Sequence, residues 1–120
     1  MDVRVLIVDD HESFRSMARL LLVADGFAVV GEAGGGVEAI AAVREVRPDV
    51  VLLDVQLPDL DGFAVAVALA EEDDPPAVVL VSSRSRGDYG GRIAQSPVCG
   101  FIPKSELSGE ALRRVLPRSA

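Results

Sequence analysis

Residues able to take part in chemistry stand at the ends of four short apolar runs. Each follows its run directly or after one proline, and together they are Asp9, Asp10, Asp54, Ser82 and Lys104. If the runs are parallel strands of one sheet, their carboxyl ends lie along one edge, where ligands bind in open α/β sheets. Three carboxylates, a hydroxyl and an ammonium group would then converge on one small pocket.

The chemistry of such a pocket points to a cation and a phosphoryl group. Clustered carboxylates repel one another unless a positive charge neutralises them. Mg²⁺ prefers oxygen ligands and keeps positions open for water and phosphate oxygens. Asp54 would then be a carboxylate nucleophile that forms an aspartyl phosphate. The metal and Lys104 would stabilise charge on the transferring group, and Ser82 would donate a hydrogen bond to it.

The elements that must position these residues follow from the apolar pattern. The runs at 3–8, 28–30, 50–53, 78–81 and 99–102 alternate with segments of helical spacing, which favours βαβ units and a parallel sheet. They are continuous and rich in Val and Leu, as is typical of strands covered on both faces. The run around 28–30 ends in Gly31 and Glu32, and we expect no catalytic group there.

Helices are expected at about 11–25, 36–47, 62–72 and 106–116. In the first of these, the apolar residues that share one face by helical spacing are Phe14, Met17, Ala18 and Leu21. The segment 84–97 differs, because it contains three glycines and little apolar periodicity. Each glycine costs a helix interior about 1 kcal/mol relative to alanine. We therefore expect a fourth helix that is short, frayed or partly disordered.

Composition fits one domain over 1–120. Of its 120 residues, 49% are hydrophobic, which is enough to cover both faces of a sheet. The net charge of −7 argues against independent binding to nucleic acid. No apolar stretch approaches the roughly 20 residues that cross a bilayer, and no signal peptide pattern is present, so we expect a cytoplasmic protein without a membrane partner. The single cysteine, Cys99, is expected to be a buried, inert thiol.

The motifs as a set resemble the receiver domain of a bacterial two-component response regulator, over essentially the whole chain. They are Val8-Asp9-Asp10, Asp54-Val-Gln-Leu-Pro58-Asp-Leu-Asp61-Gly62, Ser82 and Lys104. The resemblance implies a flavodoxin-like (βα)5 three-layer sandwich whose parallel sheet has the order 2-1-3-4-5. Asp-Asp-His-Glu near the start and Gly-Phe-Ile-Pro-Lys-Ser near the end are most similar to receivers of helix-turn-helix regulators of the LuxR/NarL type.

The same resemblance implies roles for the acidic residues and a cofactor. Asp54 would be the phosphoacceptor, with a sensor histidine kinase as the donor. Asp10 and Asp54 would ligate Mg²⁺ by their side chains, Gln56 by its backbone carbonyl, and Asp9 mostly through water. The domain would assist its own phosphorylation and dephosphorylation without being a turnover enzyme.

A switch and its partners are also implied by the resemblance. Lys104 and Ser82 would contact the phosphoryl group, and Phe101 would swing inward when Ser82 moves. The surface beside the fourth and fifth strands would then engage an output domain or protein, or a second copy in a phosphorylation-dependent homodimer. The chain is expected to be a stand-alone receiver or the receiver part of a longer transcription factor.

Three departures from the family pattern bear on that switch. Proline precedes the lysine here, as Pro103-Lys104, so we expect a different loop geometry after the fifth strand. Ser83 replaces the usual alanine or glycine and adds a polar group near the phosphate site. The glycine-rich segment 86–97 stands where a helix is usual, so we expect it to be mobile before phosphorylation and ordered afterwards.

Other functions fit parts of the pattern. An aspartate-nucleophile phosphatase needs a second acid two residues after the nucleophile, where this chain has Gln56. A flavin-binding module needs phosphate-binding hydroxyls and amides where Asp9 and Asp10 would repel a phosphate. A pseudo-receiver that acts without phosphorylation is a third alternative.

Simpler interpretations of single residues also stand. Asp9 and Asp10 could be helix caps, and Phe101 could be an ordinary core aromatic. His11 is expected to be exposed rather than a ligand. Glu32 and Asp59 are expected to be solvated surface residues.

Overall fold

A five-stranded parallel sheet forms the centre of the molecule, in the order β2-β1-β3-β4-β5. The computed structural model describes residues 2–117. The strands are β1 (Arg4–Val8), β2 (Ala28–Ala33), β3 (Val50–Asp54), β4 (Ala77–Ser82) and β5 (Gly100–Pro103). The predicted flavodoxin-like strand order is thereby confirmed.

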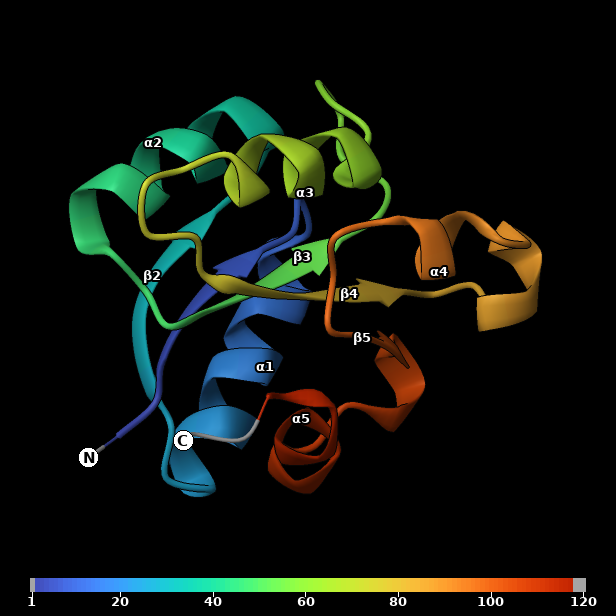
Figure 1. Ribbon diagram of the computed structural model, residues 1–120. Coiled ribbons are helices and arrows are strands. Elements are labelled where there is room, and N and C mark those ends of the chain that lie inside the picture. The colour runs from blue at the N-terminus through green and yellow to red at the C-terminus, as the bar shows by residue number, and fades with distance from the viewer. Residues whose placement is uncertain (1, 118–120) are drawn as a thin grey trace.

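Helices cover both faces of this sheet and make a three-layer sandwich (Figure 1). One layer holds α1 (Glu12–Ala24) and α5 (Gly109–Val115), and the other holds α2 (Gly36–Val46) and α3 (Gly62–Ala70). Between β4 and β5 lie a 3-10 turn, η1 (Arg86–Tyr89), and a single helical turn, α4 (Arg92–Gln95), so the fourth helix is short, as predicted. No helix within residues 2–117 is long and apolar enough to cross a membrane.

The continuous apolar strands contribute side chains to two hydrophobic cores, one on each face of the sheet. In β1, Leu6 and Val8 belong to the cluster beneath α2 and α3, whereas Val5 and Ile7 belong to the cluster beneath α1 and α5. All four side chains are fully buried. Successive side chains of a strand point to opposite faces, so a strand covered on both sides must be apolar at every position.

Some expectations about burial were wrong. Met17 is 42% exposed, because the buried stripe of α1 runs through Ala18 and Leu22 instead. Cys99 is exposed, since it precedes the edge strand β5 and is not covered by a helix. The last helix begins at Gly109 rather than near 106, because Ser108 caps it by accepting a hydrogen bond from the Ala111 amide.

Strand order brings the acidic residues to one place. β1 pairs in parallel with both β2 and β3, and Val8 lies opposite Leu53. Asp9 therefore leaves the sheet beside Asp54, which ends β3. The strand order reverses at this point, since β2 and β3 lie on opposite sides of β1, and this is where ligands bind in this architecture.

Gly62 sets how closely α3 approaches the end of β3. A Cβ atom at this position would lie 2.5 Å from the Asp54 carbonyl oxygen and 2.7 Å from Val55 Cα. Both neighbours are backbone atoms, which move only with the strand. The close approach therefore requires glycine here.

We expect Gly62→Ala to lower the free energy of unfolding by about 2 kcal/mol, because the added methyl group overpacks a rigid backbone contact. Urea denaturation followed by circular dichroism measures this change. Gly87→Ala is the matched control, since the nearest atom to its Cβ would be 4.0 Å away. Equal losses in both variants would contradict the steric explanation.

Candidate functional site

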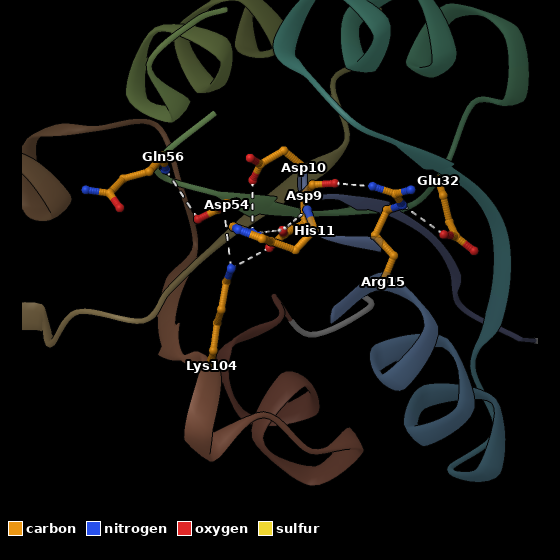
Figure 2. A network of polar contacts seen from close by, with 8 residues as sticks. All are labelled: Asp9, Asp10, His11, Arg15, Glu32, Asp54, Gln56 and Lys104. Carbon is orange, nitrogen blue, oxygen red and sulfur yellow. Dashed lines mark hydrogen bonds and ion pairs between the residues drawn. The ribbon is translucent and has the colours of Figure 1, made fainter. Parts of the chain in front are cut away.

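Four titratable side chains meet at the carboxyl ends of β1 and β3 (Figure 2). One ligand atom from each of Asp9, Asp10, His11 and Asp54 lies within 4.8 Å of those of the others. Asp9 is fully buried and Asp54 is 3% exposed, while Asp10 is exposed. The three predicted carboxylates are thus brought together, two of them out of contact with bulk water.

Lys104 supplies the positive charge of this cluster. Its Nζ lies 2.6 Å from Asp9 Oδ2 and 3.5 Å from Asp54 Oδ2, and 4.6 Å from the centre of the Phe14 ring. The lysine begins a second 3-10 turn, η2 (Lys104–Glu106), directly after Pro103. The unusual Pro103-Lys104 order therefore still lets the ammonium group reach both buried carboxylates.

The electrostatic environment of Asp54 opposes its ionisation. Burial and the neighbouring Asp9 charge raise the pKa of Asp54 from 3.8 to about 6, although Lys104 and the Gln56 amide act in the opposite direction. The Gln56 N–H donates to Asp54 Oδ1 at 3.2 Å. At neutral pH the carboxylate is ionised yet poorly solvated, the state in which a carboxylate is an effective nucleophile.

A hard divalent cation fits the donor atoms of this cluster. Asp9 Oδ2 accepts no hydrogen bond among the described residues, and its close partner there is the Lys104 ammonium group at 2.6 Å. Lys104 is shared by the Asp9 and Asp54 carboxylates, and a hard divalent cation would compensate the charge that remains on the three clustered aspartates. The Gln56 side chain points away from the cluster in Figure 2, so this residue could contribute only its backbone.

His11 was not expected to join the cluster. Its side chain is 67% exposed, as predicted, but Nδ1 lies 3.2 Å from Asp9 Oδ1 and 3.1 Å from Asp10 Oδ1. His11 is also the N-cap residue of α1, and its side chain makes no capping hydrogen bond, whereas Asp9 Oδ1 accepts from the His11 amide at 2.8 Å. Neither aspartate occupies the N-cap position of this helix, although Asp9 accepts a hydrogen bond from the N-cap amide.

Arg15 holds the end of β1 in place. Its guanidinium donates to the Asp9 carbonyl oxygen at 2.6 Å and to Glu32 at 3.0 Å. Glu32 also accepts from Arg19 at 2.7 Å, and the Arg19 hydrogen bond is the main reason that the pKa of Glu32 is lowered. Glu32 is therefore not the solvated surface residue that we expected. The spacing of Arg15 and Arg19, four residues apart, was the available signal for this pair.

The loop after β3 is tied to α2 by Asp59. Its carboxylate accepts from the backbone amides of Gly36 and Val37 at 2.8 and 3.0 Å, and these bonds lower its pKa. The N-cap position of α2 is Gly35, which has no side chain with which to cap the helix. Asp59 is exposed, as predicted, but it caps α2 from a distant part of the chain.

Ser82 and Phe101 lie beside the cluster and not in it. Ser82 is buried at the end of β4, and its Oγ hydrogen bonds with Tyr89 Oη at 2.5 Å and accepts from the Arg84 amide at 3.0 Å. Phe101 is 5% exposed and packs against the Tyr89 ring. The sequence did not single out Tyr89, because it stands alone in a glycine-rich segment.

Comparisons with known proteins agree with this geometry. Response regulator GacA of Pseudomonas viridiflava is 33% identical over 114 residues, which are 94% of this chain and 53% of that protein. The positive alginate biosynthesis regulatory protein of Pseudomonas aeruginosa is 37% identical over 117 residues, covering 93% of this chain and 46% of that protein. The chain thus spans about half the length of these curated relatives.

A solved structure extends the likeness to three dimensions. The signal receiver domain of NarL from Mycobacterium tuberculosis has a TM-score of 0.83 and 33% identity, and the match covers 98% of each chain. This confirms the resemblance to receivers of NarL-type regulators. The sequence model described as the response regulator receiver domain matches residues 5–116. The chain belongs to the response regulator receiver domain family.

Proposed function

We propose that Asp54 accepts a phosphoryl group from a sensor histidine kinase. The observation that carries this proposal is the buried Asp54 carboxylate, which lies at the end of β3 with Lys104 3.5 Å away and the Asp9 carboxylate beside it. This arrangement offers a nucleophile together with charges suited to a phosphoryl group.

The transfer uses the ionised form of Asp54. With a pKa of about 6, the carboxylate has lost its proton at neutral pH and can attack phosphorus directly. An O–P bond forms as the P–N bond of the kinase phosphohistidine breaks, and the imidazole leaves with the electron pair and takes a proton from water. Lys104 neutralises part of the charge on the phosphoryl oxygens.

Mg²⁺ is the proposed cofactor. Asp9, Asp10 and Asp54 would hold it with the Gln56 backbone carbonyl, Asp9 mostly through water. When bound, the cation supplies positive charge to the phosphoryl oxygens. The three clustered carboxylates, of which Asp9 and Asp54 share the ammonium group of Lys104, support this assignment.

We propose that the surface beside β4 and β5 transmits the signal by binding a downstream partner. Ser82 would turn towards the phosphoryl group, with Phe101 as a second switch residue, and the altered surface would engage an output domain, an output protein or a second copy of the chain. The acidic charge of −7 supports the absence of direct nucleic-acid binding. We propose one cytoplasmic receiver domain over 1–120 that assists its own phosphorylation and dephosphorylation.

The whole protein is proposed to be a transcription factor. The support is the half-length match to GacA and to the alginate biosynthesis regulator, which leaves about half of each relative for other domains. A DNA-binding region would then lie outside the receiver. The intact acidic cluster argues against a pseudo-receiver that works without phosphorylation.

Acetyl phosphate provides a direct test of the phosphoacceptor function. We expect the protein to gain the mass of one phosphoryl group when incubated with acetyl phosphate and Mg²⁺, and to gain none when EDTA replaces Mg²⁺. Intact-protein mass spectrometry measures both. Failure to gain the mass with Mg²⁺ would contradict the proposed function, and continuous release of phosphate from a simple ester would favour a phosphatase.

A further inference from the structure

The Ser82 hydroxyl is held by a tyrosine from the glycine-rich segment. Ser82 Oγ and Tyr89 Oη lie 2.5 Å apart, and Ser82 Oγ also accepts from the Arg84 amide at 3.0 Å. Neither partner belongs to the acidic cluster at the ends of β1 and β3. Ser82 is buried, so this bond is shielded from water.

The Tyr89 ring lies between two phenylalanines. Its centre is 5.8 Å from that of Phe63 in α3 and 5.8 Å from that of Phe101 in β5. Tyr89 is half-buried, and it is the last residue of η1. The ring therefore connects η1 to both neighbouring elements, and its hydroxyl connects η1 to β4.

Phe101 is poorly suited to report the position of Ser82. It is already 5% exposed, so an inward swing would bury little more of it, and its side chain has no hydrogen-bonding group. Tyr89 is half-buried and directly bonded to Ser82. Tyr89 is therefore the aromatic residue that responds directly to the hydroxyl, and its ring contacts Phe101, the second switch residue.

We infer that Tyr89 is the aromatic switch partner of Ser82, and that its hydroxyl holds Ser82 in the unphosphorylated position until a phosphoryl group on Asp54 competes for it. This inference rests on the proposed function. It assigns Tyr89 as a positioning residue, which acts on the phosphoryl group through Ser82 and does not touch it.

The competition follows from the bonding capacity of one hydroxyl. Ser82 Oγ carries one proton and two lone pairs, and the Arg84 amide occupies one lone pair. If Ser82 donates to Tyr89, its proton is already used. If it accepts from Tyr89, its proton stays free, and the competition is then for the position of the oxygen, which lies 2.5 Å from the tyrosine. We infer that Ser82 turns far enough towards Asp54 to break the bond to Tyr89 in both cases, by giving up its proton in the first and by moving its oxygen in the second.

Breaking that bond changes the output surface. The Tyr89 hydroxyl then lacks a partner in the protein, and a half-buried ring can satisfy it by turning towards water. Because Tyr89 ends η1, this motion loosens the turn and α4 beyond it. The direction is opposite to the ordering of 84–97 expected from the sequence, since the structure anchors this segment before phosphorylation.

Tyr89→Phe tests the inference with beryllofluoride, a mimic of a carboxylate-bound phosphoryl group. The variant keeps the ring and removes the competing hydroxyl. We expect beryllofluoride with Mg²⁺ to bind it about three- to tenfold more tightly than the wild type, the range expected for one hydrogen bond. Isothermal titration calorimetry of the full chain measures the affinity.

Two further variants isolate the contact. Ser96→Ala removes another hydroxyl of the same segment, which donates to the Ile93 carbonyl oxygen and lies outside η1, so its affinity should equal that of the wild type. In a Ser82→Ala background, Tyr89→Phe should have no effect on affinity. A change of equal size in that background would show that Tyr89 acts independently of Ser82 and would overturn the inference.

A second readout comes from the wild-type chain. The sequence contains one tyrosine, Tyr89, and no tryptophan. Fluorescence excited at the tyrosine absorption maximum therefore comes from Tyr89. We expect beryllofluoride to change this emission and to speed hydrogen exchange at 86–97. Unchanged emission, or slower exchange at 86–97, would overturn the inference.

The outcomes separate this inference from the proposed function. Wild-type binding of beryllofluoride, with unchanged or weaker binding by Tyr89→Phe, overturns the role of Tyr89 and leaves Asp54 as the phosphoacceptor. Absence of Mg²⁺-dependent binding by the wild type would overturn both.

Discussion

Asp54→Asn is expected to lower Mg²⁺-dependent phosphorylation by acetyl phosphate at least about 100-fold. The substitution keeps the shape of the side chain but replaces an anionic oxygen nucleophile with a neutral amide. Asp54 also lies 3.5 Å from the Lys104 ammonium group and beside Asp9, whose charge raises the pKa of Asp54. The measurement is the initial rate of mass gain by intact-protein mass spectrometry.

The matched control for this loss is Asp73→Asn. Asp73 is exposed and lies between α3 and β4, away from the acidic cluster. The Asp73→Asn substitution therefore makes the same change of charge without altering the site. Its labelling rate should equal that of the wild type. Labelling of Asp54→Asn at the wild-type rate would show that another residue accepts the phosphoryl group.

The pH dependence of the free energy of unfolding should show the ionisation of the Asp54 carboxylate. In the folded protein Asp54 keeps its proton up to a pKa of about 6, whereas the ordinary value is 3.8. Between these values the folded state binds more protons than the unfolded state, so raising the pH removes stability. We expect the metal-free wild type to lose about 2–3 kcal/mol from this group as the pH rises from about 4 to 7.

Asp54→Asn should remove this loss, because the amide does not ionise. Without metal, the variant should be more stable than the wild type at pH 7.5 by about 2 kcal/mol, and the difference should vanish near pH 4. Urea denaturation in EDTA at a series of pH values gives both profiles. Mg²⁺ should stabilise the wild type more than the variant, since a bound cation relieves the same repulsion.

Asp73→Asn again provides the comparison. It removes one negative charge from the surface, so its profile should run parallel to that of the wild type. If Asp54→Asn also ran parallel to the wild type, the buried carboxylate would not be the source of the pH dependence.

The strand pattern and the acidic residues could be predicted because they depend on local sequence. A strand covered on both faces is apolar at each position, and Val8 followed by Asp9 and Asp10 marks where it ends. The same reasoning places Asp54 after β3. Helix limits were less accurate, since the cap that starts α5 depends on Ser108 and was not recognised in the sequence.

Contacts between distant residues could not be predicted in this way. Glu32 was expected to be solvated, yet it pairs with Arg15 and Arg19, which reach it from the neighbouring helix. Met17 was expected to be inward, but helical spacing alone does not say which of two adjacent stripes faces the sheet. Such outcomes depend on how a helix rotates as it packs.

The sequence by itself determined the chemistry of this protein: a parallel sheet whose strand ends carry three aspartates, a serine and a lysine. The tertiary structure decided how these groups are connected. Lys104, in the turn that follows Pro103, contacts both Asp9 and Asp54, and the Tyr89 hydroxyl forms a hydrogen bond with that of Ser82. The physical reason is the distance along the chain over which each feature is determined. Burial and the ends of strands depend on neighbouring residues, whereas the hydrogen-bond partner of a loop residue depends on how the whole chain packs.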